Sequence, residues 1–216
     1  ELGGSDPYVV LKDADLDLAV DACISGRLLN SGQSCIAAKR FIVDKNIQSE
    51  FEKKIIEKVK TQKVGDPFLK ESSVGPMVNK KSRDELVAQV KKSIDKGAKL
   101  IYESEVPENE NGSYHPIMVL SSVKPGMPAF DEELFGPVAC IISAKNQLDA
   151  ISLANATSYG LGAAVFTSNI EIGKEIAELE LESGAGFVND FVRSDPRLPF
   201  GGIKESGYGN ELSSYG

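Results

Sequence analysis

The side chain with the clearest capacity for chemistry is Cys35, which lies in the stretch NSGQSCIAAKR over residues 30–40. Small and polar residues precede this cysteine, whereas structural cysteines usually lie inside apolar runs. The run from Asn30 to Ser34 is typical of a turn that leaves the next side chain exposed. A thiol in such a position can act as a nucleophile once it is ionised.

A reactive cysteine also needs a group that handles protons or activates water. The only histidine of the chain is His115, which argues against a histidine-based metal site and against a Ser-His triad, and we expect it to be structural. The candidate bases are therefore carboxylates, namely Glu1 in ELGGSDP and Glu133 in DEELFGPV. A solvated surface glutamate is the alternative interpretation for each of them.

The other two cysteines lie in apolar surroundings. Cys23 falls on the apolar face of a predicted helix, and Cys140 lies within the apolar run at 138–142, so we expect both to be buried packing residues. An odd number of cysteines without paired spacing argues against a disulfide framework. It favours a reducing compartment, and we expect a cytoplasmic location.

The elements that must position these residues alternate along the chain. Apolar runs predict strands at 8–11, 41–43, 99–102, 117–120, 138–143, 163–167 and 186–189. Apolar side chains spaced by three and four residues predict helices at 13–28, 47–62, 81–96, 147–155 and 171–181. This alternation is typical of an α/β fold with a mostly parallel sheet flanked by helices.

Turns and caps complete the predicted organisation. Asp13 or Asp15 can cap the first helix, and Gly97 ends the third. The polar segment PENENGS at 107–113 is predicted to form a hairpin tip, and residues 191–216 are predicted to be loop. We see no linker long enough to divide the chain, so a single domain is expected.

Composition excludes several partners. The 216 residues are 41% hydrophobic and 26% charged, with a net charge of −8, so the chain is expected to repel nucleic acid. No apolar run approaches the roughly 18 residues of a membrane span, so no membrane association is expected. The charged face of the helix at 47–62 is interpreted as a solvated surface.

Two phosphate-binding patterns are missing from the sequence. No G-x-G-x-x-G lies between a predicted strand and a helix, and no G-x-x-x-x-G-K-[ST] occurs. The segment PFGGIKESGYG at 199–209 follows no strand and opens no helix, so it is not a phosphate cradle by pattern. Its glycines can provide positive φ angles or a close approach between backbones.

Taken together, four segments resemble the aldehyde dehydrogenase superfamily. ELGGSDP at 1–7 is similar to the glutamate motif of that family, and NSGQSC at 30–35 to its cysteine motif. EELFGPV at 132–138 resembles the segment that contacts the cofactor, and PFGGIKESGYG at 199–209 resembles the late signature. All four occur in the order and spacing of the family. The resemblance covers essentially the whole chain but only part of the family protein.

The resemblance implies a specific chemistry. Cys35 would attack an aldehyde carbonyl to form a thiohemiacetal, and hydride transfer to NAD or NADP would leave a thioester that Glu1 hydrolyses by activating water. Glu133 would hold the nicotinamide ribose, and Phe135 would pack near the nicotinamide. The backbone N–H of Cys35 would form part of the oxyanion hole. The second donor, an asparagine, is expected outside this chain.

Within the superfamily, ELGGSDP and NSGQSCIAAKRFIV most resemble bacterial succinate-semialdehyde dehydrogenases. The implied reaction converts succinic semialdehyde, a small-molecule substrate, to succinate. Some of these enzymes carry an arginine directly before the asparagine of the cysteine loop, where this chain has Leu29. Arg193, Ser194 and Arg197 are then the candidates for binding the distal carboxylate. A solvated loop residue is the alternative for each.

The chain opens on ELGGSDP without a methionine, so we expect residues 1–216 to be a catalytic domain excised from a longer protein. A cofactor-binding domain and an oligomerisation tail would then be absent, the full-length protein is expected to be a homo-oligomer, and the fragment alone is expected to be inactive as a dehydrogenase. One alternative is a phosphorylating or CoA-acylating relative, in which no water-activating glutamate is expected at the position of Glu1. Another is a non-catalytic, crystallin-like relative.

Overall fold

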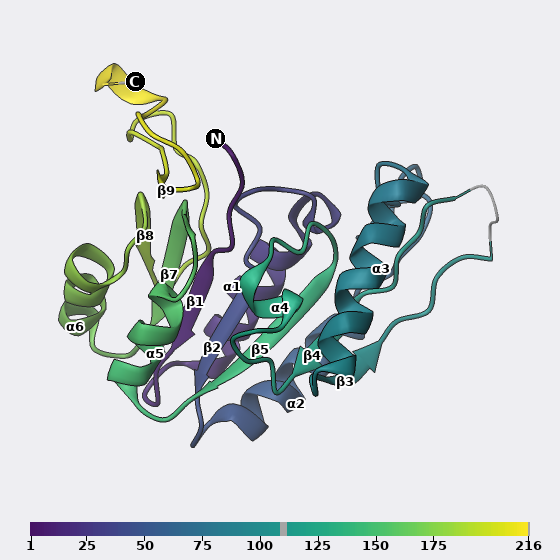
Figure 1. Cartoon of the computed structure of the whole chain (residues 1–216), viewed down its shortest axis with the longest axis horizontal. Helices are drawn as coiled ribbons and strands as arrows, with labels where there is room; N and C mark the ends of the chain where they lie inside the picture. Colours follow the sequence, from purple (N-terminus) through teal and green to yellow (C-terminus); the bar gives the residue numbers. More distant parts are fainter. Residues whose placement is uncertain (109–111, 216) are drawn as a thin grey trace.

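Seven strands form one sheet in the computed structural model, which describes residues 1–108 and 112–215. Their order across the sheet is β3-β4-β5-β2-β1-β7-β8. All neighbouring pairs are parallel except β3 and β4, which pair antiparallel (Figure 1). The strands are β1 (Pro7–Val10), β2 (Arg40–Asp44), β3 (Lys99–Glu103), β4 (Met118–Ser121), β5 (Val138–Ala144), β7 (Gly162–Phe166) and β8 (Ala185–Val188).

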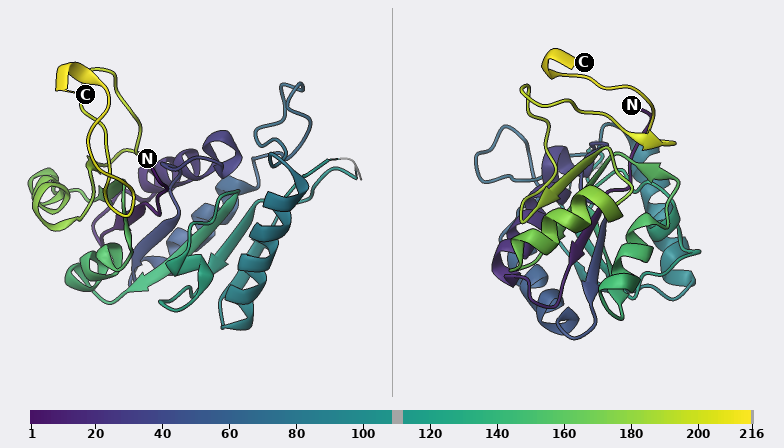
Figure 2. Two further views of the ribbon diagram at one scale, coloured as in Figure 1. Left: turned by 45° about the horizontal axis from the view of Figure 1, so that its top comes forward. Right: turned by 90° about the vertical axis from the view of Figure 1, so that its left-hand side faces the viewer.

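Helices cover both faces of the sheet, as the end-on view in Figure 2 shows. On one face lie α1 (Leu16–Leu28) and α2 (Gln48–Val59); on the other lie α3 (Lys80–Asp95), α4 (Pro128–Asp131), α5 (Gln147–Asn155) and α6 (Ile170–Glu175). Successive strand residues enter opposite clusters: Tyr8 and Val10 pack with α1, whereas Val9 packs with the helices of the other face. Burial on both sides explains why these strands are continuous apolar runs.

The predicted α/β fold, with its mostly parallel sheet, is confirmed. Every predicted strand and helix is present, and apart from the last helix their ends differ from the prediction by up to three residues. The first helix begins at Leu16 because the Asp15 side chain accepts hydrogen bonds from the N–H groups of Asp17 and Leu18. The predicted helix at 171–181 is less regular, since α6 continues as a π-helical turn at Ile176–Glu180.

The sequence predicted that the segment 191–216 is loop, but part of it forms regular structure. The two-residue strand β9 (Ile203–Lys204) pairs antiparallel with β6 (Tyr159–Gly160), and a 3₁₀ turn spans Ser213–Tyr215. Elements this short leave no periodicity to detect. Of the predicted hairpin tip at 107–113, residues 109–111 lie outside the described residues, although the flanking strands β3 and β4 do pair antiparallel.

Cys23 and Cys140 are buried and free, as predicted. His115 is also buried, and its Nδ1 lies 2.7 Å from the Pro116 carbonyl oxygen. Among the described residues, no helix combines the length and apolar character that crossing a membrane requires.

Candidate active site

The three predicted chemical residues each precede one of three adjacent strands. Glu1 lies before β1, Cys35 before β2 and Glu133 before β5, and these strands stand in the order β5-β2-β1. Because neighbouring strands of this set are parallel, the segments that enter them meet at one edge of the sheet. Residues far apart in the sequence therefore come together at the amino-terminal ends of the strands.

Glu1 and Cys35 are in direct contact. The Cys35 thiol donates a hydrogen bond to Glu1 Oε2, and Sγ lies 3.2 Å from that oxygen. Cys35 is half-buried, less accessible than the predicted exposed side chain. A nucleophile and a candidate base within hydrogen-bond reach are what nucleophilic catalysis requires.

The glycine-rich segment at 199–209 positions Glu1. The Leu2 N–H donates to the Ser206 carbonyl oxygen at 3.0 Å, and the buried Ser206 Oγ accepts from the Gly160 N–H. This contact places the N-terminus beside the C-terminal segment (Figure 1, Figure 2). Gly207 and Gly209 adopt φ angles of 133° and 78°, as the glycine pattern predicted. The sequence did not reveal that this loop supports a catalytic candidate.

The cysteine loop begins with an abrupt reversal after α1. Asn30, Ser31 and Gly32 all adopt left-handed backbone angles, with φ of 49°, 58° and 74°. A Cβ atom at Gly32 would lie 2.3 Å from the Gly136 carbonyl oxygen, so only glycine fits this approach. The buried Arg27 donates to the Gly32 carbonyl at 2.7 Å and fixes the turn. These contacts aim Cys35 toward Glu1.

The surroundings of Cys35 favour the protonated thiol. Burial raises its pKa, and the hydrogen bond to Glu1 and the charge of Glu1 act in the same direction. The positive charge of Lys39 and the Ile36 N–H oppose this shift. The thiol is therefore held with its proton directed at the carboxylate that could remove it.

Glu133 is held close to the same cluster. Its Oε1 accepts from the Gly4 N–H at 3.2 Å and lies 3.3 Å from Lys39 Nζ, while 19% of its side chain is exposed. Gly3 has a φ of 115°, and a Cβ there would approach Glu133 Oε2 to 2.8 Å. Phe135 is 42% exposed and lines, together with Glu133, a cavity of about 480 Å³ against α3. Within the described residues, no hydrogen bond engages Oε2.

The two arginines among the predicted substrate-binding residues pair with neighbouring aspartates. Arg193, Ser194 and Arg197 are on an exposed loop. Arg193 pairs with Asp190 at 2.7 Å, and Arg197 pairs with Asp195 at 2.6 Å. Among the described residues, no hydrogen bond or ion pair joins the three candidates to Cys35, Glu1 or Glu133. Arg193 borders a cavity of about 400 Å³ beside β8.

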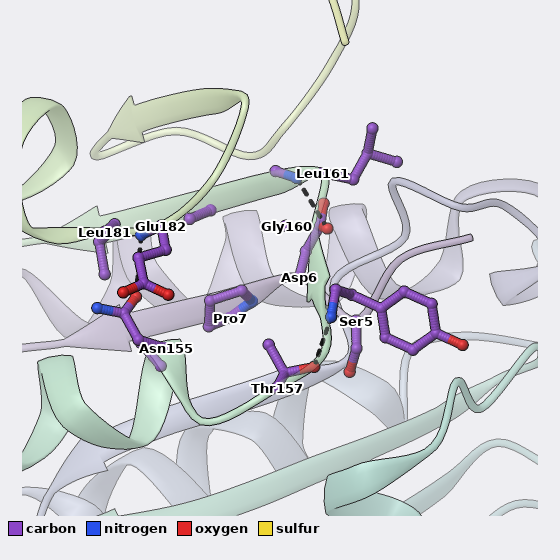
Figure 3. Close-up of a pocket in the computed structure, with 13 residues that line it drawn as sticks. Ser5, Asp6, Pro7, Asn155, Thr157, Gly160, Leu161, Leu181 and Glu182 are labelled. Carbon is purple, nitrogen blue, oxygen red and sulfur yellow. Dashed lines mark hydrogen bonds between the residues drawn. The ribbon is translucent and has the colours of Figure 1, made fainter. Parts of the chain in front are cut away.

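The sequence analysis did not single out two charged residues that the structure buries at this edge of the sheet. Lys39 is 2% exposed and Asp6 is 1% exposed. Asp6 Oδ1 accepts from the Gly162 N–H, whereas Oδ2 has no partner among the described residues; Figure 3 shows Asp6 beside Leu161. Burial raises the Asp6 pKa to about 6, against the lowering effect of the nearby Lys39 charge. The position of each charged residue, directly before a strand, was the sequence feature that could have indicated its burial.

Comparison with known proteins matches this arrangement to one family. The sequence profile described as the aldehyde dehydrogenase family matches residues 1–216. The chain belongs to the aldehyde dehydrogenase family. It is 46% identical to the NAD(P)+ succinate semialdehyde dehydrogenase Sad of Escherichia coli strain K12, over 100% of the chain and 46% of that protein. It is 43% identical to a probable NADP+ succinate-semialdehyde dehydrogenase of Synechocystis, over 100% of the chain and 47% of that protein.

Solved aldehyde dehydrogenase structures share the fold. A betaine aldehyde dehydrogenase from Staphylococcus aureus in complex with NAD+ superposes with a TM-score of 0.95 at 32% identity, covering 100% of this chain and 43% of the other. An NAD-dependent aldehyde dehydrogenase from Sinorhizobium meliloti gives a TM-score of 0.95 at 34% identity, with the same coverage. The chain spans about half the length of the curated relatives it matches.

Proposed function

We propose that residues 1–216 form the catalytic domain of an NAD(P)-dependent aldehyde dehydrogenase, with Cys35 as nucleophile and Glu1 as base. The observation that carries this proposal is the 3.2 Å contact between Cys35 Sγ and Glu1 Oε2 in a member of this family. A non-catalytic relative has no need for such a pair, so the contact favours an enzyme.

The proposed reaction begins at the thiol. Glu1 takes the Cys35 proton as Sγ bonds to the aldehyde carbonyl carbon, which gives a thiohemiacetal. The carbonyl oxygen then carries the developing charge, and the Cys35 backbone N–H, which has no acceptor among the described residues, is available to stabilise it. When bound, NAD(P) would accept the hydride that converts the thiohemiacetal to a thioester. After its first proton has passed to solvent, Glu1 removes a proton from the water that attacks this thioester, and the Cys35 thiolate that leaves takes a proton to restore the thiol.

The residues present fit the nicotinamide end of the cofactor. Glu133 Oε2 is unengaged among the described residues and can accept from a ribose hydroxyl, and the exposed Phe135 offers an apolar surface. No glycine fingerprint for a pyrophosphate lies between a strand and a helix of this chain. The chain spans 46% and 47% of two curated relatives, and we propose that a dinucleotide-binding unit and an oligomerisation tail lie outside these residues. The full-length protein would be a homo-oligomer, and this fragment alone would be inactive as a dehydrogenase.

Succinic semialdehyde is the proposed substrate, and succinate the product. The support is the relatives at 40–46% identity that carry this name. Arg193, Ser194 and Arg197 remain the proposed carboxylate-binding residues, although the substrate would compete there with Asp190 and Asp195. A phosphorylating or CoA-acylating reaction is the second candidate. Glu1 beside Cys35 favours hydrolysis over either.

Replacement of Glu1 tests the assignment in the complete protein. Glu1→Gln should slow thioester hydrolysis more than thioester formation, because water activation follows hydride transfer. Rapid mixing with succinic semialdehyde should then show an enlarged burst of reduced cofactor relative to the steady-state rate. Glu205→Gln, at an exposed position in the neighbouring loop, is the matched control and should leave the burst unchanged.

Burst and steady-state rates in Glu1→Gln that both equal those of the unaltered protein would assign the base to another residue. The substrate is tested separately, by comparing kcat/KM for succinic semialdehyde and butanal. A preference of tenfold or more for the carboxylate substrate, on the order of 1.4 kcal/mol, is expected. Equal values would exclude a carboxylate-binding site.

A further inference from the structure

Lys39 is a buried cation that the reaction above does not use. Its Nζ donates to the carbonyl oxygens of Ser34 at 3.1 Å, Cys35 at 2.9 Å and Ala37 at 3.0 Å. It also lies 3.3 Å from Glu133 Oε1. An ammonium group carries three protons, so the three carbonyls can take all of them. Glu133 is then held mainly by charge.

These contacts join two segments that enter different strands. The cysteine loop leads into β2, and Glu133 leads toward β5. Gly4 lies between them, because its N–H donates to Glu133 and a Cβ atom there would lie 2.7 Å from the Cys35 carbonyl oxygen. Fixing that carbonyl on Lys39 also restricts the orientation of the Cys35 backbone.

A purely structural residue would not need a charge here. Burying an ammonium group costs several kcal/mol before its interactions compensate, and an apolar side chain of similar volume avoids that cost. An ammonium among three carbonyls of the nucleophile loop and one carboxylate can instead orient both groups. It also places positive charge near the thiol, opposite in sign to Glu1.

We propose that Lys39 is a positioning residue, which holds the cysteine loop and the Glu133 carboxylate in one arrangement and favours ionisation of Cys35. This inference rests on the proposed function, because it assigns chemical roles to Cys35 and Glu133. In the arrangement we propose, Lys39 partly offsets the negative charge of Glu1, so the thiol can lose its proton to Glu1 when the aldehyde arrives.

The charges that surround Lys39 come from three segments. Arg27 on α1 opposes the charged ammonium, whereas Asp6 before β1 and Glu133 before β5 favour it. Burial, followed by the Arg27 charge, lowers the pKa of Lys39 to about 8. Lys39 is therefore charged at pH 7. Facing the thiol, Glu1 raises the Cys35 pKa and Lys39 lowers it.

The pH profile of Cys35 alkylation tests the proposal in the 216-residue chain. Lys39→Met should slow reaction of Cys35 with iodoacetamide about fivefold at pH 7, because the thiolate loses a nearby positive charge. The difference should shrink as the pH rises through about 8, where Lys39 of the unaltered chain becomes neutral. The alkylated residue is identified by mass mapping. Lys39→Gln keeps an amide donor without the charge and should show the same pH-dependent loss of rate. Lys12→Met, at an exposed position on the opposite edge of the sheet, should leave the profile unchanged.

A folded Lys39→Met chain with an unchanged profile would overturn the proposal. A rate that is lower by the same factor at every pH would also overturn it, since this is the result of a merely structural role. If neither neutral variant folds, ¹⁵N NMR of the unaltered chain decides. We expect the Lys39 ammonium to titrate near pH 8, and a neutral amine at pH 7 would contradict the inference. None of these measurements requires turnover, so their failure is distinguishable from failure of the proposed function.

Discussion

The polar residues at the two ends of the parallel sheet differ in how completely they are hydrogen-bonded. At the carboxyl-terminal edge, Asp13 accepts from Thr167 Oγ1 at 2.8 Å and from Ser168 Oγ at 2.6 Å, and Asn146 caps α5. At the amino-terminal edge, Asp6 Oδ2 has no partner among the described residues, and Lys39 donates to three carbonyl oxygens and pairs by charge with Glu133.

This difference distinguishes polar groups that stabilise the fold from those that we propose to take part in the reaction. A cavity of about 530 Å³ lies at the carboxyl-terminal edge, where open α/β sheets usually bind ligands. However, Asp13 and Asn146 on its wall are already used in stabilising loops and helix ends. At the other edge lie buried charged groups and the contact between Cys35 and Glu1, which can support proton transfer from a nucleophile to a base. The size of a cavity alone would have indicated the edge opposite to the one that we propose.

The comparison depends most on the thiol at the amino-terminal edge. Cys35 should react with substoichiometric iodoacetamide on the order of a thousandfold faster than Cys140, because thiolate content and accessibility both differ. Burial raises the pKa of Cys140 to about 12, and it raises that of Cys23 well above its usual value. Mass mapping of the alkylated chain measures the ratio. Preferential labelling of Cys23 or Cys140 would break the comparison.

Asp6 provides a second test at the same edge. Its folded-state pKa is raised to about 6 from 3.8, so the folded state binds the proton more tightly than the unfolded state. The stability from this proton is fully present below pH 3.8 and is lost as the pH rises through about 6. At about 1.4 kcal/mol per pH unit, the loss is on the order of 3 kcal/mol.

Asp6→Asn should remove this pH dependence. We expect the free energy of unfolding of the unaltered chain to fall, relative to that of the variant, between pH 4 and pH 7. Urea unfolding at several pH values measures the difference. Parallel curves for the two proteins would show that Asp6 keeps an ordinary affinity for its proton.

Asp13, at the opposite edge, should show the reverse sign and the smallest effect. Burial alone would raise its pKa, but hydrogen bonds from Ser168 and Thr167 lower it overall. Its contribution to stability is therefore present above the unfolded-state pKa and is lost as the pH falls below it. Asp13→Asn should lower the free energy of unfolding by about 1 kcal/mol at pH 7.

The control for this variant is Asp95→Asn, at the exposed end of α3, which should change stability by less than about 0.5 kcal/mol. Unfolding by urea at pH 7 and pH 3.5 measures both proteins. A loss for Asp13→Asn that grows as the pH falls would contradict the assigned sign and remove the contrast between the edges.

Much of the fold could be predicted from local sequence patterns. The apolar runs indicated the strands, and the spacing of apolar side chains indicated the helices, because both depend on residues close in the chain. The pairing of β6 with β9 could not be predicted, since each strand has only two residues and its partner is over 40 positions away. The same limit applies to the role of Ser206 in holding the segment that carries Glu1.

The sequence by itself determined which residues could do chemistry. A cysteine in a polar turn and two glutamates in distinctive segments were recognisable as residue types in local settings. Only the tertiary structure decided which of them meet: the order β5-β2-β1 brings Glu133, Cys35 and Glu1 to one edge, whereas Arg193 and Arg197 pair with neighbouring aspartates. Strand order and the burial of Lys39 follow from packing between distant segments. No short stretch of sequence carries that information.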